Sequence, residues 1–296
     1  MVTLLLRSIV NSRALDFPIP GRWLKYVPNG PMLPYTDTDD GIALTHYSGA
    51  DLRELQRRNI IHPQWLSLSG SPEILDPDLE VLLAFSTLRG LSLGGCENIG
   101  DAGIRAVAAL ENVECLNLQL CHRVSDAGCA HLANLPKLRW LDLSWVYHIS
   151  NDGLSTLAYL PRLEELYLAD NRSIDDTGIE CLSRATHLRS LFIEMIDVTD
   201  MALQHLGDNA RELRQLEFNR LLAVSDRGLS ALSKCSNLID LRFSGCPLIT
   251  GAGVRTLAAL KNLHNLRICD CARITKGDVE WLDSHLSNCN IQVRLL

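Results

Sequence analysis

A period of 25 residues is the feature of this chain that most constrains its fold. From Leu88 onward, units such as LRGLSLGGCENIGDAGIRAVAALEN and VECLNLQLCHRVSDAGCAHLANLPK align without gaps at their starts. One unit upstream, residues 63–87, fits the same frame, and IQVRLL (291–296) follows the ninth unit. A period of this length indicates a solenoid, in which each unit buries its apolar face only against its neighbours.

Each unit divides into a predicted strand, a turn and a helix. The pattern LxxLxLxxC alternates apolar and polar residues, which is typical of a strand with one buried face. An Ile/Val-Ser/Thr-Asp-x-Gly segment follows, and side chains such as Ser125 and Asp126 are suited to cap the next helix. The turn of the fifth unit begins one residue early, and its longer GDNARE segment restores the length of the unit to 25 residues. This compensation indicates that strand register matters.

These units resemble leucine-rich repeats, specifically the cysteine-containing subfamily found in F-box-type substrate receptors. The residues that carry the resemblance are ITDxGL-like segments and the ninth-position cysteines Cys96, Cys121, Cys246 and Cys271. The resemblance covers residues 63–296 and implies an α/β horseshoe solenoid, with a parallel sheet on the concave face and helices outside. It also implies that the first, fourth, sixth and ninth positions point inward, and the third, fifth, seventh and eighth lie on the concave surface.

This register predicts a binding surface on the concave face. Trp140 and Trp145 are expected to be exposed there, beside an aromatic centre, surrounding acids and a closing pair of arginines. The predicted partner-binding residues are Trp140, Asp142, Trp145, Tyr167, Phe192, Glu194, Glu217, Arg242 and Arg267. Exposed clusters of large apolar side chains indicate interaction sites, and Trp, Tyr and Arg are enriched among binding hot spots. The alternative is that the rings pack on each other across strands, or lie beneath the N-terminal segment.

Composition and motifs argue against several other functions. A net charge of -7 argues against nucleic acid or an anionic membrane as the main target. No apolar run approaches the roughly 18–20 residues of a transmembrane helix. The ten cysteines include no C-x-x-C pair, so we expect free thiols and no zinc site. GLSLG (90–94) lies inside a predicted strand and lacks the strand–turn–helix context of an esterase. We therefore expect no catalytic site, no metal and no cofactor.

Residues 1–62 break the period and are predicted to form an N-terminal cap or docking segment in front of the repeat domain, residues 63–296. The stretch 18–34 is rich in proline and should be irregular. SGADLRELQRRN should then form a helix, with Ser48 and Asp51 in a capping box. This region does not match an F-box, which would need a longer helical segment.

The sequence therefore predicts a non-catalytic protein-interaction module, acting as an adaptor, scaffold or recognition subunit. Two narrower alternatives remain open: a substrate-recognition subunit of a ubiquitin ligase, and an assembly factor of a mitochondrial complex. We expect a cytoplasmic protein. The arginines Arg7 and Arg13, with no acid before Asp16, leave a mitochondrial location as the alternative.

Overall fold

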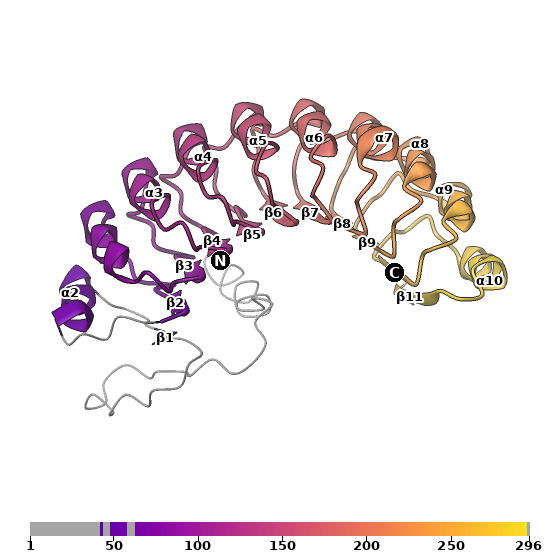
Figure 1. The fold of residues 1–296 in the computed structure, drawn as a ribbon. Helices are drawn as coiled ribbons and strands as arrows, with labels where there is room; N and C mark the ends of the chain where they lie inside the picture. The colour runs from indigo at the N-terminus through magenta and orange to yellow at the C-terminus, as the bar shows by residue number, and fades with distance from the viewer. Residues whose placement is uncertain (1–41, 44–47, 58–62, 295–296) are drawn as a thin grey trace.

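The computed structural model describes residues 42–43, 48–57 and 63–294. Within them, one parallel sheet runs along the inside of an arch and the helices lie outside it (Figure 1). The strands are β1 (Ile42–Ala43), β2 (Trp65–Ser67), β3 (Gly90–Ser92), β4 (Cys115–Asn117), β5 (Trp140–Asp142), β6 (Glu165–Ala169), β7 (Ser190–Glu194), β8 (Gln215–Asn219), β9 (Asp240–Ser244), β10 (Asn265–Cys269) and β11 (Asn290–Arg294).

The helices alternate with these strands along the chain. They are α2 (Gly49–Arg57), α3 (Asp101–Val107), α4 (Asp126–Leu132), α5 (Asn151–Leu157), α6 (Asp176–Ser183), α7 (Asp200–Asn209), α8 (Asp226–Ala231), α9 (Gly251–Thr256) and α10 (Lys276–His285), with short 3₁₀ helices η1 (Asp76–Ala84), η2 (Leu232–Lys234) and η3 (Leu257–Ala259). Among the described residues, no helix is both long and apolar enough to cross a membrane.

The predicted α/β leucine-rich-repeat horseshoe is confirmed. Each strand pairs in parallel with the strand of the next repeat, and the register aligns equivalent positions: Leu141 pairs with Leu116 on one side and Leu166 on the other. The closing strand, expected at 291–296, is β11, which pairs with β10 and begins one residue earlier. The period of the sequence therefore becomes the register of the sheet.

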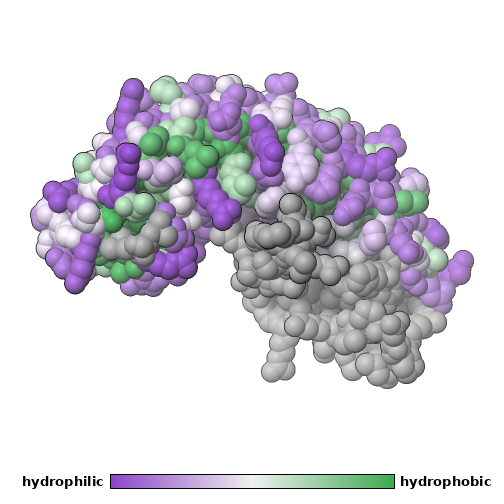
Figure 2. Space-filling view, turned by 180° about the vertical axis from the view of Figure 1, so that it is seen from behind, coloured by the Kyte–Doolittle hydropathy of each residue, from purple (hydrophilic) through white to green (hydrophobic). Residues whose placement is uncertain are grey.

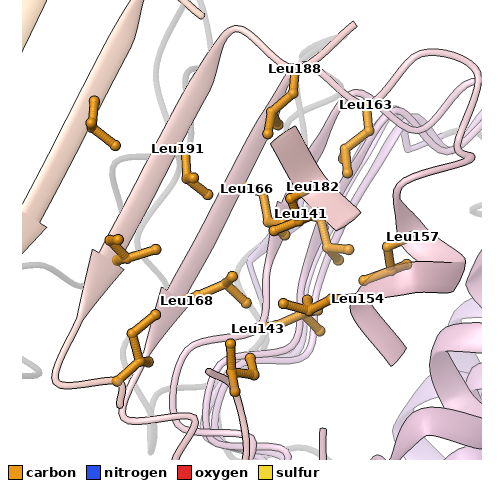
Figure 3. Close-up of a cluster of buried hydrophobic side chains, with 14 of the residues drawn as sticks. Leu141, Leu143, Leu154, Leu157, Leu163, Leu166, Leu168, Leu182, Leu188 and Leu191 are labelled. Carbon is orange, nitrogen blue, oxygen red and sulfur yellow. The ribbon is translucent and has the colours of Figure 1, made fainter. Parts of the chain in front are cut away.

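The core lies between the sheet and the helices. Leu141 and Leu143 from β5 and the turn after it pack with Leu166 and Leu168 of the next repeat, and each of the four is at most 1% exposed. Figure 3 shows these side chains meeting leucines of the neighbouring helices and turns. Burial of one such side chain contributes about 1.5–3 kcal/mol, so the stacked leucines are the main source of stability.

A second contact between repeats lies on the convex side, at the start of each helix. Asp126 accepts hydrogen bonds from the backbone N–H and hydroxyl of Ser150 in the next repeat, at 2.8 and 2.6 Å, and from the N–H of Gly153 at 3.1 Å. We call the aspartates that bind a Ser or Thr of the following repeat in this way the boundary carboxylates. They are Asp101, Asp126, Asp176, Asp200 and Asp226.

The boundary carboxylates explain the glycine of the Ser/Thr-Asp-x-Gly segment. A Cβ added to Gly153 would lie 2.4 Å from Oδ1 of Asp126, so a side chain there would displace the carboxylate. The predicted capping is confirmed as well, since Ser150 also accepts a hydrogen bond from the N–H of Asp152 at 3.2 Å. In the shortened fifth repeat Ala202 takes the glycine's place and still donates to Asp176, at 3.1 Å.

The described part of the N-terminal segment extends the sheet and the row of helices. β1 pairs with β2, and the predicted helix is observed as α2, with Leu52 buried. Ser48 donates to the Asp51 carboxylate through its backbone N–H at 2.9 Å. Residues 1–41, 44–47 and 58–62 lie outside the described residues, so the cap or docking role of residues 1–62 stays a prediction.

Gly153→Ala should destabilise the protein by about 1–3 kcal/mol, because the added methyl group would push Asp126 away from the next repeat. The same substitution at Gly277, where the nearest atom to a Cβ would be Oγ1 of Thr275 at 3.9 Å, should have the opposite sign. Gly277→Ala should stabilise α10 by roughly 0.5–1 kcal/mol. Urea denaturation measures both changes, and equal stabilities for the two variants would contradict this account.

Candidate functional site

The strand register brings the predicted aromatic side chains together on the concave face. Asp142 pairs with Tyr167, and Tyr167 with Phe192, across β5, β6 and β7. The rings of Tyr167 and Phe192 are stacked, with centroids 4.0 Å apart and planes 4° from parallel. The indole of Trp140 lies against Tyr167, with centroids 5.2 Å apart and a 47° tilt. We call Trp140, Tyr167 and Phe192 the central cluster.

The prediction that Trp140 is exposed is wrong. Its side chain is only 5% exposed, although the register places it on the concave side of β5. The ring of Tyr167 on the neighbouring strand lies against the indole, and a large neighbour of this kind shields a ring that an isolated strand would leave in solvent. The alternative of rings packing across strands therefore holds for Trp140, whereas Tyr167 and Phe192 are half-buried and reach solvent.

Trp145 is half-buried and lies apart from the central cluster, since no ring contact joins it to Trp140, Tyr167 or Phe192 among the described residues. It follows the end of β5 and has a φ of 64°, in the left-handed region. Its carbonyl oxygen lies 2.8 Å from Nδ1 of His122, and its N–H donates to the carbonyl of Ala169 at 2.7 Å. The left-handed backbone separates its indole from the rings on the strands.

The same left-handed conformation occurs at the eighth position of each of the nine repeats. The residues are Gly70, Gly95, Leu120, Trp145, Asp170, Met195, Arg220, Gly245 and Asp270, with φ between 53° and 76°. Sequence reasoning missed this feature, because glycine, the residue that adopts this region most easily, occupies only Gly70, Gly95 and Gly245 of these positions. A run of non-glycine residues gives no local signal of a left-handed turn.

Asp142 is the most perturbed acid of the candidate site. It is half-buried, and burial raises its pKa to about 6 despite a hydrogen bond from the backbone N–H of Ser144 at 2.8 Å. Asn117, at the same position of the preceding repeat, accepts an equivalent hydrogen bond from Gln119 at 2.8 Å. A neutral amide can therefore make the same hydrogen bond at this position. Of the two equivalent residues, only Asp142 can carry a charge.

The remaining predicted residues continue the row toward the C-terminus. Glu194 ends β7 and is half-buried. The Arg242 guanidinium binds Asp240 at 2.7 Å and lies 3.8 Å from Glu217. Arg267 donates to the side-chain oxygen of Gln292 at 2.9 Å. The predicted arginine pair thus occupies the expected place, but Arg242 is already neutralised by acids of its own sheet.

A half-open hollow of about 190 Å³ lies on this C-terminal part of the face. It was not predicted, because its lining comes from β8 to β11 and the turns that follow them. The lining residues are Glu217, Asn219, Arg242, Phe243, Ser244, Arg267, Cys269, Asp270 and Arg294. Two of its charged groups, Arg294 and Asp270, form an ion pair with each other.

The ninth-position cysteines Cys96 and Cys121 have a structural role. All ten are free thiols, as predicted. At the ninth position, the Sγ of Cys96 donates to the carbonyl of Leu68 at 3.1 Å, and that of Cys121 to the carbonyl of Leu93 at 3.2 Å. Asn171 does the same in its repeat, donating to the carbonyls of Leu143 and Val146. Within the described ranges no three His, Cys, Asp or Glu side chains gather as a metal site would require.

Trp140→Ala should cost about 3–5 kcal/mol of unfolding free energy, because it removes a buried indole and leaves a cavity. Tyr159→Ala is the control, since that ring is 87% exposed and its loss should change stability by less than about 0.5 kcal/mol. Guanidinium denaturation compares the two variants. A Trp140→Ala protein as stable as the wild type would place the indole in solvent after all.

Asp142→Asn should stabilise the protein at neutral pH. Because the folded-state pKa of Asp142 is raised to about 6, ionising this carboxyl costs the folded state more than the unfolded chain. The wild type therefore loses stability as pH rises from about 4 through 6. Asp142→Asn should gain about 1–2 kcal/mol at pH 7.5 and little at pH 4. Thermal unfolding at both pH values measures this.

Asp175→Asn provides the control of opposite sign. A hydrogen bond from the backbone N–H of Thr177 lowers the pKa of Asp175, so its charge stabilises the fold at neutral pH and less as pH falls. The substitution should therefore lower the melting temperature at pH 7.5. A gain for Asp142→Asn that is the same at both pH values would contradict the electrostatic explanation.

A family model and one solved structure agree with this architecture. A family model described as Leucine Rich repeat matches residues 86–108 and 160–183. Internalin C2 of Listeria monocytogenes is 23% identical over 74% of this chain and 83% of its own, with a TM-score of 0.52. A second internalin of that organism is 22% identical over 77% and 73% of the two chains, with a TM-score of 0.48.

A structure of the yeast Rad7 and Elc1 complex is 16% identical over 83% of each chain, with a TM-score of 0.43. No curated protein sequence matches the chain significantly. The two segments matched as leucine-rich repeats lie in the register that the strands and helices follow throughout. The chain therefore contains leucine-rich repeats and has the solenoid fold that such repeats form.

Proposed function

We propose that this protein is a non-catalytic binding module that holds another protein on the concave face of its arch, along the central cluster. The leucine-rich repeats point to a protein–protein interaction module. The observation that carries the finer proposal is the stacked pair of Tyr167 and Phe192, half-buried on the inside of the arch and outside the hydrophobic core.

The position of this pair favours binding over a purely structural role. The core leucines lie on the other side of the sheet, so the two rings are not needed to join sheet and helices. Rings that stay partly exposed in the middle of a curved surface offer apolar area that a partner can cover. Figure 2 shows that hydrophilic residues cover most of the described surface in that view, with hydrophobic residues in smaller patches.

The proposed surface keeps the predicted residues with altered roles. Tyr167 and Phe192 would contact the partner directly, and Trp140 would support them from below. Asp142, Glu194, Glu217, Arg242 and Arg267 would surround them, with Trp145 at the rim. The N-terminal segment, residues 1–62, remains a second candidate docking site.

The double variant Tyr167→Ala/Phe192→Ala should lose the proteins that the wild-type chain captures in affinity purification. Each ring should contribute about 2 kcal/mol or more to binding, a loss of roughly 30-fold in affinity per ring. Tyr159→Ala removes an exposed ring outside the concave face and should capture the same proteins as the wild type. The proposal would be overturned if the wild type, Tyr167→Ala/Phe192→Ala and Tyr159→Ala all captured the same proteins, with both variants melting near the wild-type temperature.

A further inference from the structure

The residue just before each strand alternates between arginine and glutamate from β3 to β6, and neighbours in this row form ion pairs. Arg89 donates to the Glu114 carboxylate from Nε at 3.0 Å and from an Nη at 2.9 Å. Arg139 binds Glu164 in the same way, at 3.2 and 2.9 Å. In both pairs the backbone N–H of the glutamate also donates to the carbonyl of the arginine. The row therefore accommodates a two-point ion pair between repeats.

The row changes at β7 and β8, where arginine follows arginine. Arg189 precedes β7 and Arg214 precedes β8, and these two strands are adjacent near the middle of the arch (Figure 1). The backbone N–H of Arg214 donates to the carbonyl of Arg189 at 2.8 Å, as the glutamates do in the earlier pairs. The backbone contact is the same, but a second guanidinium stands where the earlier pairs have a carboxylate. We call Arg189 and Arg214 the rim arginines.

The rim arginines are exposed, and neither forms an ion pair or a side-chain hydrogen bond with another described residue. Glu164, at the start of the neighbouring strand, is bound to Arg139 at 2.9 Å. Glu165 and Glu212 form no ion pair with a rim arginine in the described chain. Because like charges on neighbouring strands repel, a carboxylate placed between the rim arginines would be favourable.

Two further exposed arginines extend this basic zone. Arg162 and Arg211 lie in the loops that lead into β6 and β8, and neither takes part in an ion pair within the described ranges. The whole chain has a net charge of -7, so these four arginines create a local field opposite in sign to the charge of the protein. A negatively charged ligand would be attracted to this zone and repelled by the protein as a whole.

The rim arginines also lie close to the central cluster. Arg189 precedes Phe192 by three residues, which corresponds to about 10 Å along β7 at the rise of an extended chain. An extended partner segment of about four residues covers the same distance. A single segment of a partner can therefore contact both the half-buried rings and the rim arginines.

We propose that the rim arginines bind a glutamate or aspartate side chain from an acidic, extended segment of the protein partner. This inference rests on the proposed function and names the chemistry of the partner beside the central cluster. A carboxylate has two oxygens and can accept hydrogen bonds from two guanidiniums at once, just as Glu114 accepts two from Arg89. The incoming acid would also remove the repulsion between the rim arginines.

Calorimetric titration of the full chain with a synthetic peptide tests the proposal. The probe is an acetylated and amidated peptide of alternating glutamate and serine, at low ionic strength, where exposed charges interact most strongly. The wild type should bind it, and Arg189→Gln/Arg214→Gln should bind it about ten-fold or more weakly. The same peptide with glutamine in place of glutamate should not bind. Absence of binding of the glutamate peptide to the wild type would overturn the proposal.

Arg214→Glu tests whether the site can be filled from within the chain. The substitution restores the arginine–glutamate order of the earlier pairs, so Arg189 should gain an internal partner, as Arg139 has in Glu164. The variant should lose the peptide and should melt at the wild-type temperature or above it. Peptide binding equal to that of the wild type would contradict the proposal. A melting temperature below that of the wild type would show that a carboxylate does not fit there, and would also overturn it.

Arg105→Gln/Arg227→Gln is the matched control, because it removes the same charge from exposed positions on helices α3 and α8. Its affinity for the glutamate peptide should stay within about two-fold of the wild type. An equal loss of affinity in Arg189→Gln/Arg214→Gln and in this control would indicate unspecific attraction and would rule out a site at the rim arginines.

Partner capture separates this inference from the proposed function. If Arg189→Gln/Arg214→Gln captures the same proteins as the wild type while Tyr167→Ala/Phe192→Ala loses them, the concave face binds a partner without an acid at the rim arginines. Loss of those proteins by both of these double variants, with the control Arg105→Gln/Arg227→Gln retaining them, supports the proposal.

Discussion

The boundary carboxylates join five of the repeats to the repeat that follows, on the convex side of the arch. The first N–H groups of a helix have no partner within the helix, and here a carboxylate of the preceding repeat supplies one. Asp126 binds Ser150 and Gly153 in this way. On the inner side, hydrogen bonds hold neighbouring strands about 4.8 Å apart, whereas packed helices need about 8–10 Å. The sheet must therefore curve, and its hollow side becomes the surface available to a partner.

Much of this architecture could be predicted from sequence, because it depends on repeated residues. The leucines of LxxLxLxxC are buried where the period places them, and Ser125 caps α4 as its motif indicates. The cysteines at the ninth position bond to loop carbonyls, as a small group with a weak donor should. In each case the same residue type recurs in the same environment, so one unit explains the others.

The features that sequence reasoning missed depend on contacts between units that differ. Asp126 occurs in a capping motif, and nothing within its own repeat shows that its carboxylate binds the following repeat. The repeat pattern predicts an exposed Trp140, because its position lies on the concave side of the sheet. Its burial depends instead on the size of Tyr167 on the neighbouring strand. The hollow near Arg267 likewise requires four strands and their turns. Such properties follow from neighbouring side chains, which a single repeat pattern does not describe.

The candidate surface combines features that follow from the repeated pattern with features that depend on differences between repeats. The register placed Asp142, Tyr167 and Phe192 in one row, and the structure shows them in adjacent strands. Their environments follow from differences between repeats: Asn117 and Asp142 share a position and a hydrogen-bond geometry but differ in charge. Chemical identity on this face can therefore change from one repeat to the next over an unchanged backbone.

The eighth position shows how far this freedom extends. Its left-handed backbone is the same under glycine, leucine, tryptophan, aspartate, methionine and arginine. Since the fold imposes this conformation from outside, replacing one side chain by another there leaves the course of the chain unaltered. The eighth positions thus form a row along the sheet at which the side chain can vary while the backbone stays the same. Substitutions there could change what the protein binds without a change of fold.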